Sequence, residues 1–159
     1  MENYEKILLY VYPKFGAVIS TLEGKFKSII ASSRYALEPA ETSLNNLIEV
    51  GDLIRILKTT KDVVKKALLT LDEVERDFVE FKYFKLTYDG LLDFNTQSYD
   101  YRRLDIKVIK KFKKYLERFG ITEKWFDDNL MRFSFIREVA RRTQKIEKEF
   151  FTNISNIIS

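Results

Sequence analysis

Apolar residues recur at steps of three and four along most of the chain, the spacing that places side chains on one face of an α-helix. Residues 3–12 have a helical composition, and Pro13 suits the first position of a second helix that runs to about Ser32. The stretch 32–39 loses this periodicity and ends on a proline, so we expect a loop there. A further stripe begins at about Ala40 and predicts one long amphipathic helix or two collinear helices. Its members are Leu44, Leu47, Ile48, Ile54, Leu57, Val64 and Leu68.

A capping signal marks the start of the next helix. Thr70 and Glu73 have the spacing of a capping box, in which each side chain accepts a hydrogen bond from a backbone amide of the other residue. Leu69 and Val74 can form the hydrophobic staple across it, so we expect this helix to begin at Leu71. The apolar face is expected to hold Val74, Phe78, Phe81 and Phe84. The outward face is expected to hold Glu75, Arg76, Glu80 and Lys82.

Another boundary lies at Gly120, which suits the last turn of a helix. Thr122 can cap the following helix, and Ile121 can pack against Phe126. Downstream we expect a packing face made of Leu130, Phe133, Ile136, Val139 and Ala140, with Arg132, Arg137, Arg141 and Arg142 outside. In the tail from residue 150, apolar residues at helical steps favour core packing over a contact with another copy, and these are Phe151, Ile154, Ile157 and Ile158.

The composition also indicates an all-α globular fold. Among 159 residues there are only 5 glycines and 2 prolines, too few for the turns of a many-stranded sandwich or barrel. Apolar residues make up 45% of the chain and charged residues 33%, which is typical of a globular protein. No apolar stretch approaches the roughly 20 residues that span a bilayer, so we expect a cytoplasmic protein with no membrane partner. We expect an N-terminal helical segment 1–69, a three-helix unit 70–120 with a short middle helix within 87–94, and C-terminal helices 121–159, all in one cooperative domain.

The residue types exclude most catalytic chemistry. The chain has no cysteine and no histidine, so it lacks disulfides, thiolate metal sites, the commonest zinc ligand and the commonest general base. No glycine-rich sequence of the kind that holds a phosphate is present. Acidic pairs such as Asp127 and Asp128 are typical of solvated helix faces. We therefore expect no enzyme, no catalytic residue, no metal site and no cofactor.

The densest charge lies on the helix predicted for residues 97–118. The side chains expected to face the core are Tyr101, Leu104, Val108, Phe112, Tyr115 and Phe119. The remaining surface carries eight basic and three acidic residues, in a chain whose net charge is +4. The basic residues are Arg102, Arg103, Lys107, Lys110, Lys111, Lys113, Lys114 and Arg118, and the acidic ones are Asp100, Asp105 and Glu117. Such a face can neutralise phosphates and release counterions, and Arg102 and Arg103 are long enough to reach guanine edges in a major groove.

Three features follow one another between residues 69 and 116. They are a capped helix with the core ERDFVEFKYF, a Thr-Tyr-Asp that opens a short helix at Thr87, and a Ser-x-x-x-Arg-Arg start to the basic helix. In this order they resemble the helix-turn-helix of sigma-70 region 4 and of small sigma-like regulators from phages and mobile elements of low-GC bacteria. The last helix of that family enters the major groove. The resemblance implies DNA contacts for Ser98, Tyr99, Arg102, Arg103 and Lys107, to which the basic face adds Lys110, Lys111 and Lys114.

We therefore expect an all-α helical bundle with a central helix-turn-helix unit, acting as a sequence-specific DNA-binding transcription regulator with double-stranded DNA as its partner. A contact with RNA polymerase and a homodimer through the amphipathic helices stay open. The alternative is a helical interaction or assembly protein, also phage-related, with a degenerate helix-turn-helix. Its basic helix would bind an acidic partner or serve only as a solvated surface.

Overall fold

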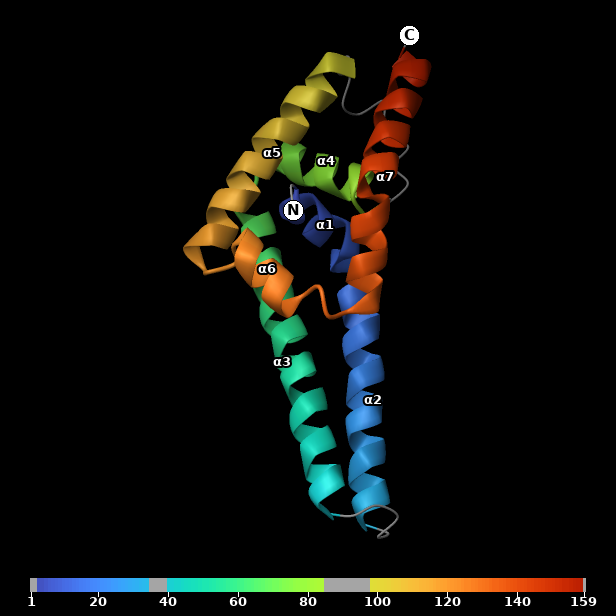
Figure 1. The fold of residues 1–159 in the computed structure, drawn as a ribbon. Coiled ribbons are helices and arrows are strands. Elements are labelled where there is room, and N and C mark those ends of the chain that lie inside the picture. The colour runs from blue at the N-terminus through green and yellow to red at the C-terminus, as the bar shows by residue number, and fades with distance from the viewer. Residues whose placement is uncertain (1–2, 35–39, 85–97, 159) are drawn as a thin grey trace. The chain divides into compact units, whose positions relative to one another are not determined.

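A computed structural model describes residues 3–34, 40–84 and 98–158 (Figure 1). Every regular element in these ranges is helical, which confirms the all-α fold class. The elements are α1 (Tyr4–Val11), a 3-10 turn (Tyr12–Lys14), α2 (Phe15–Arg34), α3 (Ala40–Leu69), α4 (Glu73–Lys82), α5 (Ser98–Arg118), α6 (Glu123–Asn129) and α7 (Ser134–Ile158). None of the described helices combines the length and the apolar character needed to cross a membrane.

Two compact units make up the fold. One consists of residues 14–62, and the other combines residues 1–13 with residues 63–159. The stripe that begins at Ala40 forms one continuous helix, α3, whose first part belongs to the smaller unit and whose last turns belong to the larger one. The loop expected at 32–39 is wrong for residues 32–34, which belong to α2, and its remainder lies outside the described residues. The expected middle helix at 87–94 also lies outside them, so the helix-turn-helix arrangement stays a prediction.

The smaller unit is a hairpin of two antiparallel helices. Glu23 of α2 pairs with Lys58 of α3 at 3.1 Å, and Phe26, one turn later in α2, lies against Gly51, two turns earlier in α3. A later residue of α2 thus contacts an earlier residue of α3, so the two helices are antiparallel. Leu44 and Ile48 were predicted to belong to the buried stripe of α3, but they are 57% and 56% exposed, so this part of the prediction is wrong. The residues of α3 that are buried are Ser43, Val50, Leu57, Thr60, Val64 and Ala67.

The core of the larger unit is built around α1. This short helix packs against α7 and α5, and it is buried around its whole circumference, with Ile7, Leu8 and Leu9 at most 2% exposed. A helix whose whole circumference is buried belongs inside a bundle rather than at its surface. Tyr4 adds a polar link, because its hydroxyl donates a hydrogen bond to the carbonyl of Ile121 at 3.2 Å.

The start of α4 differs from the sequence prediction. Asp72 rather than Thr70 is the N-cap, because its side chain accepts a hydrogen bond from the Glu75 amide while the Glu75 side chain accepts one from the Asp72 amide. The Thr70 hydroxyl instead donates to the carbonyl of Ala67 in the last turn of α3. The capping box is real but lies two residues later, and it draws Glu75 inward. The expected staple is absent as well, since both of its members, Leu69 and Val74, are more than half exposed.

Several side chains of α4 and α5 occupy faces opposite to those predicted. Glu75, Lys82 and Asp105 were expected to point outward, but each is at most 3% exposed. Phe119 was expected in the core and is 53% exposed, whereas Leu116 takes the buried position in the same part of α5. For Glu75, Lys82 and Asp105 the apolar periodicity predicted the wrong helix face, because these buried charged residues interrupt the apolar stripe.

The boundary at Gly120 agrees with the sequence prediction. Gly120 has φ of 81°, the left-handed conformation that glycine adopts without steric cost. Thr122 caps α6 by accepting a hydrogen bond from the Trp125 amide, and Ile121 and Phe126 are both buried. The four arginines predicted to lie outside are exposed, while Phe133, Ile136, Val139, Phe151 and Ile154 of the C-terminal block are buried.

Candidate nucleic-acid interface

The basic helix α5 has two sharply different faces. Tyr101, Val108 and Phe112 are at most 1% exposed. Tyr101 contacts two rings of α4, with centroids 6.1 Å from Phe78 and 6.4 Å from Phe81. These contacts fix the rotation of α5 about its own axis, so the identity of its exposed face follows from the packing.

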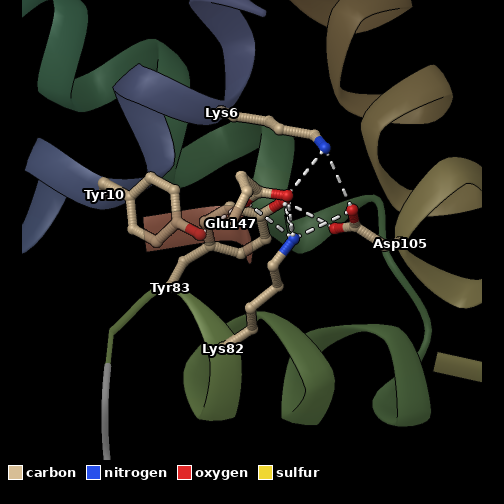
Figure 2. Close-up of polar contacts among 6 residues, drawn as sticks. All are labelled: Lys6, Tyr10, Lys82, Tyr83, Asp105 and Glu147. Atoms are coloured by element: carbon tan, nitrogen blue, oxygen red, sulfur yellow. Dashed lines mark hydrogen bonds and ion pairs between the residues drawn. The ribbon is translucent and has the colours of Figure 1, made fainter. Parts of the chain in front are cut away.

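Four charged side chains from α1, α4, α5 and α7 meet behind the buried face of α5 (Figure 2). We call Lys6, Lys82, Asp105 and Glu147 the ionic cluster. Lys82 Nζ lies 2.9 Å from a carboxylate oxygen of Asp105 and 2.9 Å from one of Glu147. Lys6 Nζ contacts the same two carboxylates at 3.3 and 3.0 Å. Each carboxylate is therefore shared by two ammonium groups, and the formal charges of the cluster cancel.

Two tyrosines complete the hydrogen bonding of the carboxylates. Tyr83 donates its hydroxyl proton to Asp105, and Tyr10 donates to Glu147 (Figure 2). The two tyrosine rings also pack on each other, with centroids 4.6 Å apart. Buried carboxylates need such donors, because an unmet acceptor in a low-dielectric interior is costly.

The surroundings of Lys82 are aromatic. Its ammonium lies 4.5 Å from the ring centroid of Tyr83, 5.3 Å from that of Phe150 and 4.8 Å from that of Phe151. Ring faces attract a desolvated cation, so these contacts add to the two ion pairs. The Lys82 side chain is 0% exposed, which leaves it no route to a substrate in this conformation.

The pKa shifts follow from burial and pairing. Burial lowers the pKa of Lys82, against the opposing pull of Asp105 and Glu147. Burial alone would raise the pKa of Glu147, but the ion pair with Lys82 and the hydrogen bond from Tyr10 lower it overall. Burial and the hydrogen bond to Glu147 raise the pKa of Tyr10, so this tyrosine stays neutral. The arrangement serves to hold four helices together by charge, and α5 is one of them.

The opposite side of α5 is a continuous basic surface. We call Arg103, Lys107, Lys110 and Lys114 the basic face. They follow at steps of four, three and four residues and are all exposed, on the side of the helix away from Tyr101, Val108 and Phe112. Asp105 lies within the buried stripe on the opposite side of α5, so it brings no negative charge to this surface. Between residues 102 and 114 the exposed charges of α5 are therefore all positive.

Two of the other predicted contact residues are engaged within the protein. The guanidinium of Arg102 lies 4.1 Å from the ring centroid of Phe151 in α7. Arg102 also lines a cavity of about 320 Å³ together with Lys6, Asp105, Ile106, Glu147, Lys148, Phe151 and Thr152. Lys111 Nζ pairs with the buried Glu75 carboxylate at 2.8 Å, and that hydrogen bond raises the pKa of Lys111. Both contacts tie α5 to its neighbours.

The remaining predicted residues, Ser98 and Tyr99, lie in the first turn of α5, and their side chains are outside the described part of the structure. The sequence interpretation missed the ionic cluster. A signal for one member was present, because Asp105 falls four residues after Tyr101 and three before Val108, within the apolar stripe itself. A charge at such a position indicates a buried partner. Nothing in the local pattern marked Lys6 or Glu147 as that partner.

Within the described residues, no group of three or more acidic, cysteine or histidine side chains is placed to hold a metal ion. Comparison of the chain with protein-family models, with curated proteins and with solved structures finds no significant match.

Proposed function

We propose that this protein binds double-stranded DNA through the basic face and acts as a sequence-specific transcription regulator. The observation that carries the proposal is the sorting of charge on α5. Its one acidic residue between positions 102 and 114, Asp105, is buried in the ionic cluster, while Arg103, Lys107, Lys110 and Lys114 are exposed together. A solvated surface helix that binds nothing does not require acidic and basic side chains to be separated in this way.

The dimensions of the basic face suit a duplex. From Arg103 to Lys114 the helix rises about 16 Å, and an α-helix fits the width of the major groove. Lysines along such a helix neutralise phosphates on either side of the groove, and an arginine can form two hydrogen bonds with a guanine. We assign the base contact to Arg103, because Arg102 is stacked on Phe151.

Salt dependence of binding tests the proposal. Three neutralised phosphates, one for each of Lys107, Lys110 and Lys114, predict a slope of about −2.7 for the logarithm of the binding constant against the logarithm of salt concentration. The variant Lys107→Gln, Lys110→Gln, Lys114→Gln should reduce the magnitude of this slope by about 2.7. Fluorescence anisotropy with a labelled duplex measures both values.

A matched control removes the same charge elsewhere. The variant Lys65→Gln, Lys124→Gln, Lys145→Gln changes three exposed lysines that lie outside α5. It should keep the slope of the parent protein. If the slope falls equally in the two triple variants, DNA is attracted by the net charge alone. If the parent protein shows no measurable binding, the proposal is rejected.

The basic face would also suit an acidic protein partner, the alternative left open by the sequence. The exposed isoleucines and leucine of the α2–α3 hairpin favour an interaction role of some kind. The two functions need not exclude each other, because the hairpin and α5 belong to different units.

A further inference from the structure

The α2–α3 hairpin exposes large aliphatic side chains in the half where α2 ends and α3 begins. Ile30 is 41% exposed, Leu44 57% and Ile48 56%. Other apolar residues of α2, such as Leu22 and Phe26, are half-buried, and Phe26 lies against Gly51 of α3. Exposed aliphatic residues that gather in one place indicate a contact surface more strongly than scattered ones do.

The helical spacing places these three residues on one flank of the hairpin. The ion pair between Glu23 and Lys58 marks that flank on both helices. Ile30 lies seven residues, or about two turns, after Glu23. Leu44 lies fourteen residues, or about four turns, before Lys58, and Ile48 follows Leu44 by one turn. Whole turns keep a side chain on the same side of its helix, so all three project from the flank that carries the ion pair.

Charge on this half of the hairpin is divided between the two helices. The charged residues of α2 between positions 24 and 32 are Lys25 and Lys27, both exposed and both basic. Over residues 41–52 of α3 the charged residues are all acidic, and these are Glu41, Glu49 and Asp52. Further along α3 the sign reverses, with Arg55, Lys58 and Lys61.

We propose that this flank is the contact surface for a second copy of the chain, related by a two-fold axis parallel to the hairpin. The flank consists of Ile30, Leu44 and Ile48 with Lys27 and Asp52 beside them. In this arrangement α2 of one copy lies antiparallel to α3 of the other, and the result is a four-helix bundle. The basic half of each α2 then faces the acidic half of the partner's α3. The other two-fold arrangement, with its axis across the hairpin, would place α2 against α2 and α3 against α3. Only the parallel axis therefore brings the lysines of α2 to the acidic half of the partner's α3.

Sedimentation velocity over a range of concentrations tests the proposal. The parent protein should show twice the chain mass at high concentration. The variant Leu44→Ser, Ile48→Ser should weaken dimerisation by about tenfold or more, because the aliphatic area that leaves water on association is lost. Its control is Thr42→Ser, Asn45→Ser, which alters neighbouring exposed and uncharged positions of α3 on another side of the helix and should leave the dimer intact.

Charge reversal tests the orientation. Lys27→Glu alone should weaken the dimer, and Lys27→Glu combined with Asp52→Lys should restore it. A two-fold axis parallel to the hairpin keeps each residue at its own height, and the contacts of Glu23 with Lys58 and of Phe26 with Gly51 place Asp52 at the height of Lys27. Lys25→Glu makes the same charge change two residues away, on the other side of α2, and should have little effect. A parent protein that remains a monomer up to about 1 mM overturns the proposal. A dimer that the Leu44 and Ile48 variant leaves unchanged also overturns it. If the Lys27 and Asp52 pair fails to compensate, the two-fold arrangement is rejected.

Discussion

Lys82 and Asp105 form an ion pair of 2.9 Å with side chains that are 0% and 4% exposed. The pair joins α4 to α5, and Glu147 extends it to α7. Charges this deeply buried stabilise a protein only while their partners are present, because desolvation costs several kcal/mol for each ion. The orientation of the basic helix therefore depends on keeping the ionic cluster whole.

Removal of Lys82 should be strongly destabilising. Lys82→Met keeps the length of the side chain but leaves Asp105 and Glu147 with only Lys6 as a cation. We expect a loss of about 3–5 kcal/mol in the free energy of unfolding, measured by urea denaturation. Lys110→Met, on the exposed side of α5, should change it by less than about 0.5 kcal/mol.

Combining Lys82→Met with Glu147→Gln tests whether the loss comes from the uncompensated charge. The double variant should lose clearly less unfolding free energy than the two single variants lose together, because Glu147→Gln removes the excess negative charge that Lys82→Met creates. Additive losses would show that packing of the lysine stem, rather than its charge, carries the effect.

Stability should also fall at acid pH through Glu147. The pKa of Glu147 in the folded protein is lowered from its ordinary value of 4.5. The stabilisation from Glu147 is therefore fully present above about pH 4.5 and is lost as the pH falls through the lower folded value. Glu147→Gln should flatten the dependence of the unfolding free energy on pH between about pH 5 and 3. An unchanged acid slope would contradict the ion pairing of Glu147.

The N-cap of α4 offers a test of local structure. Asp72→Ala should cost about 1 kcal/mol, because the Glu75 amide loses its acceptor. Asp72→Asn keeps an acceptor in place and should cost only a few tenths of a kcal/mol. Thermal unfolding of both variants measures the difference, and equal melting temperatures would speak against Asp72 as the cap.

The sequence predicted helices well wherever apolar periodicity or a cap was undisturbed. The break between the first two helices near Pro13 and the boundary from Gly120 to Thr122 follow from local rules of backbone geometry. The stripe from Ala40 left one helix or two collinear helices open, and α3 is the single helix. Helix faces were less predictable. Asp105 and Lys82 look like surface residues to any rule that counts polarity, and only their mutual pairing makes burial possible.

In the candidate interface, too, local features were predictable from the sequence and tertiary contacts were not. The exposure of Arg103, Lys107, Lys110 and Lys114 was predicted from helical spacing alone, which needs no knowledge of the tertiary fold, whereas their contacts with DNA stay a prediction. The engagement of Arg102 with Phe151 was not predictable, because the two residues are almost fifty positions apart in the chain. Contacts between distant segments require the packed structure.

Ile106 gives a prediction about base recognition. It is 68% exposed and lies three residues after Arg103 and four before Lys110, so it borders the basic face. An aliphatic side chain at this place in a major groove would contact the methyl group of thymine. Once a bound sequence is known, replacing the contacted thymine by uracil should weaken binding by about fourfold.

The same replacement should have no effect on Ile106→Ala, because the side chain that senses the methyl group is gone. Anisotropy titrations of two proteins against two duplexes measure the four affinities. If the parent protein binds both duplexes equally at every thymine position, Ile106 makes no such contact, although DNA binding itself could still stand.

Selection from fragmented genomic DNA tests the central claim most directly, because it asks whether the protein recognises a sequence and through which residue. The parent protein should enrich fragments that share a short motif, and Arg102→Ala should enrich the same motif, since Arg102 is stacked on Phe151. Arg103→Ala should cost roughly 1–3 kcal/mol on that motif and lose preference at one base position. Recovery of fragments with no common motif by the folded parent protein, or an unchanged motif with Arg103→Ala, would contradict recognition through the basic face.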